Sequence, residues 1–180
     1  FLLLLLQFYF ANRLFMELGR PQGRLYSPFL RENLHYVSWI RGSILYVANL
    51  ITHAFGFDTY MIGDKILKVV DGRSVIMARQ CVGLEIMGFW AAFILAHSSS
   101  WWRKLSWTVA GLFAISMINA IRVAVLLIAL EKDWQVITDI EIRHTMFNIA
   151  AYACIVLMIV LYYRQSKKHA EATAVDAFLQ

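Results

Sequence analysis

The sequence predicts an all-α polytopic membrane protein with a small β-hairpin segment outside the bilayer. The chain has 180 residues, of which 60% are hydrophobic and 16% are charged, whereas a soluble domain is usually about 45–50% apolar. Several apolar windows reach the roughly 18 residues that indicate a membrane-spanning helix. A polar segment between these windows carries β-branched residues and turn dipeptides instead, which is the pattern of short strands.

Five transmembrane helices are expected, and aromatic residues collect near their ends, as they do at membrane interfaces. The expected helices are Phe1–Leu18, His35–Phe57, Val82–Trp102, Leu105–Leu130 and Thr145–Tyr163. Residues 1–165 are expected to form one transmembrane domain, and residues 166–180 a flexible cytoplasmic tail. The chain starts with Phe in hydrophobic sequence, so we expect a truncated N-terminus with further helices upstream. A cleaved signal peptide fits less well, because no small-residue cleavage site follows Leu2–Leu6.

The segment 58–80 is expected to form a small extracytoplasmic sheet. Ile66–Val70 and Arg73–Met77 flank Asp71-Gly72, a dipeptide that suits a type I′ hairpin turn, and Thr59–Ile62 is a candidate for an earlier strand. An open sheet edge cannot lie in hydrocarbon, so this segment belongs outside the bilayer. A free edge of the hairpin is a candidate for accepting an extended substrate segment as an added strand.

The distribution of basic residues predicts the orientation. One side of the five-helix path carries Arg20, Arg24, Arg31, Arg103, Lys104, Arg164, Lys167 and Lys168. The positive-inside rule places that side in the cytoplasm. The net charge of +5 is therefore explained by topology, and we expect no nucleic-acid partner.

Three reactive groups on separate predicted helices reach the outer layer of the membrane. Cys81 lies where the polar segment ends and a helix begins, and a helix N-terminus favours a thiolate. Arg122 lies eight residues inside the outer end of the next helix, at a depth of about 12 Å, from which a guanidinium can extend outward. His144 lies at the outer end of the last helix. A thiol, a guanidinium and an imidazole in one layer predict a cysteine enzyme that performs acyl transfer.

Two residues near Arg122 are candidates for a supporting role. Asn119 is three residues earlier on the same helix face, where it can hold the guanidinium or the backbone around it. Glu85, one turn after Cys81, can form a structural ion pair with Arg122, and such a pair does not exclude catalysis. A charged group inside a membrane helix normally faces a partner or a wet cavity.

The assignment of the base has an alternative. Arg143 and Glu141 neighbour His144 and can orient its ring or tune its charge, and an imidazole is the usual base for a thiol. His53 lies on the same side of the membrane and is the main rival to His144.

The segments Gln80-Cys81-Val82-Gly83-Leu84 and Asn119-Ala120-Ile121-Arg122, followed by His144 at the start of the last helix, resemble the exosortase/archaeosortase family. The resemblance covers residues 58–164 and implies a polytopic membrane cysteine protease or transpeptidase. It implies that Cys81 is the nucleophile, with Arg122 and His144 in the site, and a histidine at position 144 is similar to the bacterial exosortase branch. The sequence departs from the family in having Val82 where many members have Ser, in the unusual charge of Glu85, and in showing five helices rather than about eight.

The resemblance also implies the setting of the reaction. The substrates are expected to be exported proteins with a C-terminal sorting helix, which the enzyme removes, and a membrane lipid or lipid-linked molecule is a candidate acceptor. The enzyme is expected in the bacterial cytoplasmic (inner) membrane, with its active site on the extracytoplasmic side.

Two other classes of function remain open at this stage. A non-enzymatic transport or assembly subunit would use an Arg122–Glu85 pair for structure and would not need Cys81. A thiol redox protein is disfavoured because the second cysteine, Cys154, is expected in the middle of a membrane helix. We expect no metal and no cofactor, since no Cys or His pair has zinc-site spacing.

Overall fold

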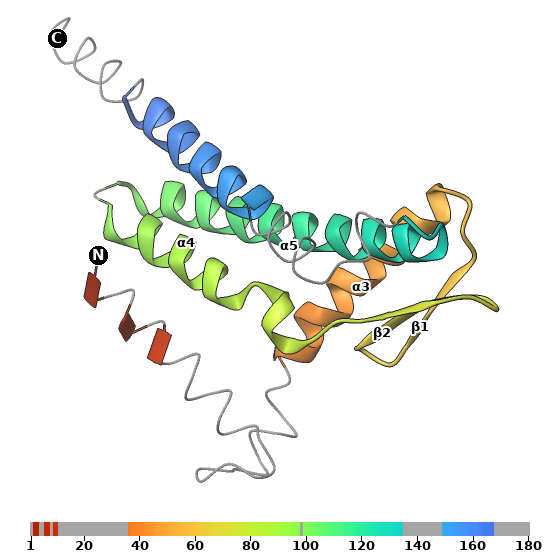
Figure 1. Ribbon diagram of the computed structural model, residues 1–180. Helices are drawn as coiled ribbons and strands as arrows, with labels where there is room; N and C mark the ends of the chain where they lie inside the picture. Colours follow the sequence, from red (N-terminus) through yellow and green to blue (C-terminus); the bar gives the residue numbers. More distant parts are fainter. Residues whose placement is uncertain are drawn as a thin grey trace, which may run out of the picture. The chain divides into compact units, whose positions relative to one another are not determined.

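The computed structural model describes residues 2–3, 6–7, 9–10, 36–97, 99–134 and 149–167. The chain divides into two compact units, residues 1–143 and residues 144–180. The first unit contains α3 (Tyr36–Ala54), β1 (Thr59–Ile62), β2 (Ile66–Val69), β3 (Ser74–Ile76), the 3-10 turn η1 (Arg79–Val82), α4 (Leu84–Ala96) and α5 (Trp101–Glu131) (Figure 1). Residues 2–3, 6–7 and 9–10 are helical. The second unit contains the helix Ile149–Lys167.

Two helices in the described part of the chain are long and apolar enough to cross a membrane, α5 and Ile149–Lys167. Helix α4 has 13 residues and is about 20 Å long, which is less than the roughly 30 Å of a hydrocarbon core. The mostly helical architecture with a small sheet confirms the predicted class in part, but five spans are not observed. Much of the predicted helix Phe1–Leu18 and most of the predicted tail 166–180 lie outside the described residues.

The boundary between α4 and α5 differs from the prediction. Helix α4 ends at Ala96 instead of Trp102, and α5 already begins at Trp101 instead of Leu105. His97 and Ser100, which flank the break, both have extended backbone conformations, as expected where serines compete for backbone hydrogen bonds. The Lys104 ammonium donates a hydrogen bond of 3.1 Å to the Leu95 carbonyl, so it satisfies a carbonyl in the last turn of α4.

The polar segment forms the predicted three-stranded sheet. Its strands are antiparallel in the order β1-β2-β3, with Leu67 opposite both Met61 and Val75. The predicted type I′ turn is wrong. The Val70–Arg73 connection has a positive φ only at Asp71 (55°), whereas type I′ needs it at both central residues.

One core joins the sheet to α3 and α5. Strand β2 alternates half-buried and buried positions, because successive side chains of a strand point to opposite faces. The buried cluster comprises Ile44, Leu45, Ala48, Leu67, Val69, Val75, Met77, Val82, Ala120, Val123, Ala124 and Leu127. The last four residues of that list lie on α5, so one face of the helix near its C-terminal end is buried by protein.

Helices α4 and α5 pack closely at a glycine. Trp90 is fully buried, and a Cβ atom placed on Gly111 would lie 1.8 Å from the Trp90 Nε1. The same Nε1 donates a hydrogen bond of 3.0 Å to the Trp107 carbonyl. The indole therefore occupies the space that a side chain at position 111 would need.

Candidate functional site

Cys81 lies in the short turn between the sheet and α4. Its backbone N–H donates to the Ala78 carbonyl at 3.0 Å, and its half-buried side chain packs against the core. Gly83 follows with a φ of 80°, and α4 begins only at Leu84. The thiol therefore lies before the first turn of α4 and not at the helix N-terminus that the sequence predicted.

Asn119 connects this turn to α5. Its side chain is 8% exposed, and its Nδ2 donates a buried hydrogen bond of 3.0 Å to the Val82 carbonyl. A Cβ atom on Gly83 would lie 2.7 Å from the same Nδ2, so a glycine allows the amide to approach. The prediction placed this amide on the Arg122 guanidinium or on the backbone around it, whereas its hydrogen bond reaches Val82, the residue that follows Cys81.

Arg122 lies one turn further along α5 than Asn119, on the same face of the helix. Its side chain is half-buried and interacts with its surroundings. The neighbouring residues Ala120 and Val123 belong to the core that Cys81 contacts. The structure thus brings Cys81, Asn119 and the Arg122 turn of α5 into one region.

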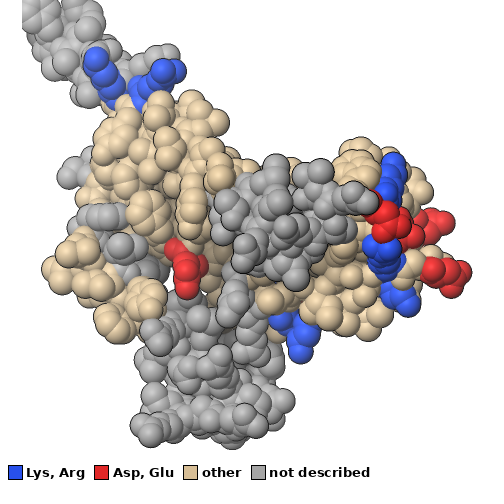
Figure 2. All heavy atoms as spheres, in the orientation of Figure 1, with Lys and Arg blue, Asp and Glu red and all other residues tan. Residues whose placement is uncertain are grey.

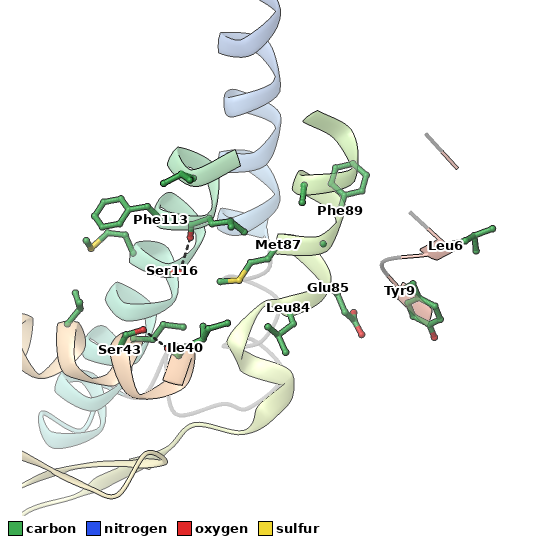
Figure 3. Close-up of a pocket in the computed structure, with 17 residues that line it drawn as sticks. Leu6, Tyr9, Ile40, Ser43, Leu84, Glu85, Met87, Phe89, Phe113 and Ser116 are labelled. Carbon is green, nitrogen blue, oxygen red and sulfur yellow. Dashed lines mark hydrogen bonds between the residues drawn. The ribbon is translucent and has the colours of Figure 1, made fainter. Parts of the chain in front are cut away.

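Glu85 does not form the predicted ion pair with Arg122. The ion pairs between described residues are Arg41–Asp64 and Arg73–Asp133. The Glu85 side chain is exposed, and it lies on the side of α4 that faces Tyr9 (Figure 3). The hypothesis of a transport or assembly subunit relied on an Arg122–Glu85 ion pair, and the described part of the chain does not contain it.

The candidate base is not described. His144 and its neighbour Arg143 both lie outside the described residues. The rival base, His53, is engaged elsewhere, because its Nε2 lies 2.8 Å from the oxygen and 3.1 Å from the nitrogen of the Thr59 backbone. Thr59 begins β1 at one end of the sheet, and the Met77–Lys65 hydrogen bond, after which the chain enters η1, lies at the other end. The structure therefore does not bring His53 to Cys81.

A buried cation on α3 holds the turn between β1 and β2. Arg41 is 3% exposed, and its guanidinium pairs with the Asp64 carboxylate while its Nε donates to the Asp64 carbonyl at 2.7 Å. Desolvation raises the pKa of Asp64, but the hydrogen bonds from Arg41 and Ser38 and the charge of Arg41 outweigh it, so the net pKa is lowered. An arginine within an apolar helix was the sequence signal for this contact.

Helices α3, α4 and α5 surround an apolar cavity of about 880 Å³. Leu84 and Met87 of α4 point toward α3 and α5, as Figure 3 shows. Among the described residues that line the cavity, Glu85 is the one that is charged, and the lining also includes Ile40, Val47, Leu112 and Phe113. The cavity begins one turn beyond Cys81, so an apolar helix or acyl chain could lie near the thiol.

The family model described as transmembrane exosortase (Exosortase_EpsH) matches residues 1–161. The chain belongs to the transmembrane exosortase family. No curated protein and no solved structure matches the chain significantly. Together with its two long apolar helices, family membership identifies the chain as a membrane protein.

The charge distribution of this exosortase-family chain is uneven. Figure 2 shows acidic and basic side chains gathered at the end of the first unit where the hairpin lies. At this end, the Arg73 N–H donates to the Glu131 carboxylate at 2.9 Å, and the Arg73 guanidinium pairs with Asp133. The end of α5 is therefore tied to the hairpin tip by polar contacts, which fits a position outside hydrocarbon.

Proposed function

We propose that this exosortase is a membrane-embedded cysteine protease or transpeptidase that removes a C-terminal sorting helix from exported proteins. The observation that carries the proposal is the hydrogen bond of 3.0 Å from Asn119 Nδ2 to the Val82 carbonyl. It fixes the Cys81 turn against α5 within one helical turn of Arg122. A rigidly held nucleophile and a cation on the neighbouring helix favour acyl transfer, because the nucleophile is positioned and the developing oxyanion can be stabilised.

In the first step, the Cys81 thiolate attacks the carbonyl carbon of the scissile peptide bond. Arg122 stabilises the negative charge that develops on the carbonyl oxygen. His144, as its conjugate acid, gives a proton to the leaving amine, which is the new N-terminus of the sorting helix. The peptide C–N bond breaks, and the exported protein remains attached to Cys81 as a thioester.

In the second step, water or an acceptor nucleophile attacks the thioester. His144 removes the proton of the attacking group, and the thiolate of Cys81 leaves. Water gives a free carboxylate, whereas a membrane lipid or lipid-linked acceptor gives an anchored protein. Arg143 orients His144 in this proposal, and the apolar cavity next to Glu85 is the side from which the sorting helix or the acceptor approaches.

The experiment measures intact masses of a processed exported protein from cells with and without the active enzyme. Cys81→Ala is expected to abolish processing, and Arg122→Ala and His144→Ala to reduce it by at least about a hundredfold. The mass of the product identifies the cleavage point and any attached group. Normal processing by Cys81→Ala at equal protein abundance would refute the proposal.

Cys154→Ala is the matched control, because it removes the second thiol from the helix Ile149–Lys167. This variant is expected to process the substrate normally. Loss of processing in Cys154→Ala but not in Cys81→Ala would indicate that the wrong cysteine has been assigned.

A further inference from the structure

The two edges of the sheet are not equivalent. The Val70 N–H donates to the Asp58 carbonyl at 2.9 Å. Since successive residues of an antiparallel strand direct their N–H and C=O groups alternately toward and away from the partner, those of Thr59 point away from β2. His53 contacts both of these Thr59 groups. The outer edge of β1 is therefore partly capped by a side chain of α3.

The outer edge of β3 is open. Hydrogen bonds from Met77 N–H to Lys65 O (2.8 Å) and from Val69 N–H to Arg73 O (3.0 Å) show that residues 73 and 77 face β2. The backbone groups of Ser74 and Ile76 consequently point away from the sheet. Within the part of the chain that the structure describes, no hydrogen bond reaches these groups.

Strand β3 is short, which limits pairing with other chains, but its composition offers no other protection of the edge. Natural edge strands carry a charge, a proline or a bulge that prevents pairing with another chain. Strand β3 is Ser-Val-Ile, and its Ile76 side chain is 69% exposed. An exposed β-branched side chain on an unpaired edge is suited to a cross-strand contact with an added strand.

The open edge leads directly to the nucleophile. Ile76 is followed by Met77 and Ala78, and the hydrogen bond of 3.0 Å from Cys81 N–H to Ala78 O closes the next turn. Two extended residues cover about 7 Å. A peptide paired beside Ile76 would thus reach Cys81 about three residues further along its chain.

We propose that the extended segment preceding the sorting helix of an exported protein binds as a fourth strand to β3, parallel to it. This inference rests on the proposed function, in which the substrate chain consists, from its N-terminus to its C-terminus, of an exported part, a cleavage site and an apolar helix. The sorting helix must enter the membrane beyond Cys81, and β3 runs from the hairpin tip toward Cys81 (Figure 1). The substrate chain therefore runs in the same direction as β3.

Disulfide crosslinking tests the pairing and its direction without requiring turnover. Enzyme variants in a Cys81→Ala, Cys154→Ser background carry one cysteine, at Ser74 or at Ile76. The probe is an exported protein of the source organism that ends in an apolar helix of about 20 residues, with single cysteines placed in turn along the ten or so residues before that helix. Mild oxidation in membranes then forms the crosslinks.

Parallel pairing predicts that the substrate position crosslinked by Ile76→Cys lies two residues C-terminal to the one crosslinked by Ser74→Cys. The reverse order would overturn the direction. Absence of a preferred position at both sites, or equal crosslinking from Tyr60→Cys on β1, would overturn docking on β3.

A proline variant tests the same edge by activity. The Ile76 N–H is not used in pairing with β2, so Ile76→Pro removes only the outward donor and leaves the sheet bonded. Processing is expected to fall at least about fivefold in Ile76→Pro, and no more than about threefold in Ile76→Ala, which keeps the N–H. Equal rates in the two variants would contradict the proposal.

The two proposals fail in different ways. Normal processing by Cys81→Ala refutes the proposed chemistry, whereas the crosslinking pattern reports binding in that same inactive background. A dead Cys81→Ala enzyme together with unaffected Ile76→Pro processing and no ordered crosslinks refutes the β3 docking and leaves the chemistry standing.

Discussion

Gly83 determines how the chain leaves the Cys81 turn. Its φ of 80° lies in the left-handed region, which costs a residue with a side chain roughly 1–2 kcal/mol. Its missing side chain also leaves room for the Asn119 amide, which would otherwise lie 2.7 Å from a Cβ atom. One residue thus sets both the backbone direction and the approach of α5.

Gly83→Ala is expected to destabilise the protein by about 1–3 kcal/mol and to lower the processing rate, because the Asn119–Val82 contact must shift. The matched control is Gly42→Ala in α3, where nothing lies within 4 Å of the added Cβ and alanine favours the helix. Thermal unfolding in detergent measures both. An unchanged melting temperature for Gly83→Ala would contradict the assigned role of this turn.

At the scale of elements, the packing of α4 on α5 depends on a contact between a large and a small residue. Gly111→Ala would bring a methyl group within 1.8 Å of the Trp90 Nε1, so the indole must move and lose its hydrogen bond to Trp107. We expect a loss of about 1–3 kcal/mol. Thermal unfolding measures this loss. The double variant Gly111→Ala/Trp90→Leu should lose less stability than the sum of the losses in the two single variants, because the smaller Leu side chain relieves the overlap.

The contact between α3 and the sheet is expected to depend on pH. The lowered pKa of Asp64 means that its ionised form is stabilised in the folded state. This stabilisation is complete above the ordinary pKa of an aspartate and is lost as the pH falls through the lower, folded-state value. Melting temperatures between about pH 3 and 7 should therefore fall at the acidic end in the native sequence and show a smaller dependence in Asp64→Asn.

Asp64→Asn should also lower stability at neutral pH by about 1–3 kcal/mol, because it weakens the pairing of the buried Arg41. The control is Asp133→Asn, whose partner Arg73 is exposed like Asp133 itself, and which should change stability by less than about 1 kcal/mol. Equal effects of the two substitutions would show that burial of Arg41 does not matter.

At the scale of the whole molecule, α5 is longer than a membrane is thick. Its 31 residues extend about 46 Å, which exceeds the hydrocarbon core by about 16 Å, or roughly eleven residues. One face of its C-terminal third, with Val123, Ala124 and Leu127, belongs to the core that includes the sheet, so we infer that this third projects beyond the bilayer. Arg122 then lies at the level of the sheet and does not need to extend outward from hydrocarbon.

This placement is tested by labelling single cysteines in a Cys81→Ala, Cys154→Ser background with a membrane-impermeant maleimide. On intact cells, Asp71→Cys at the hairpin tip should react, and Trp102→Cys should react only after permeabilisation. Phe113→Cys, although 66% exposed in the protein, should stay unlabelled, because it lines the apolar cavity in the part of α5 that we place within the bilayer. Labelling of Trp102→Cys before Asp71→Cys would reverse the proposed orientation.

Local patterns were sufficient to predict the sheet, because period-two alternation and turn residues are properties of neighbouring positions. The turn type was not predictable in this way: the Asp71-Gly72 connection also contacts Glu131, 58 residues from Arg73, and such a contact depends on the fold. The helix break before Trp101 was misplaced because apolar residues continue on both sides of a short serine segment.

The candidate site was predictable only as residue types. Cys81, Arg122 and Asn119 were identified from their chemistry and spacing, but the partner of Asn119 is a backbone carbonyl, which no side-chain pattern marks. The Glu85–Arg122 pair was wrong because complementary charge does not specify the face of α4 on which Glu85 lies. Arg41 stands in an apolar helix, which indicates a partner, but nothing local marks that partner, Asp64, in a turn of the sheet.

Two of the close contacts that α5 makes with α4 and the turn before it lie at Gly111 and Asn119. They are eight residues apart, a rise of about 12 Å, on one side of a continuous helix. Inserting one residue between them would turn one contact by about 100° relative to the other, so both could not form together. Residues 112–118 therefore act as a spacer of fixed length. Homologous chains should show substitutions there without insertions or deletions.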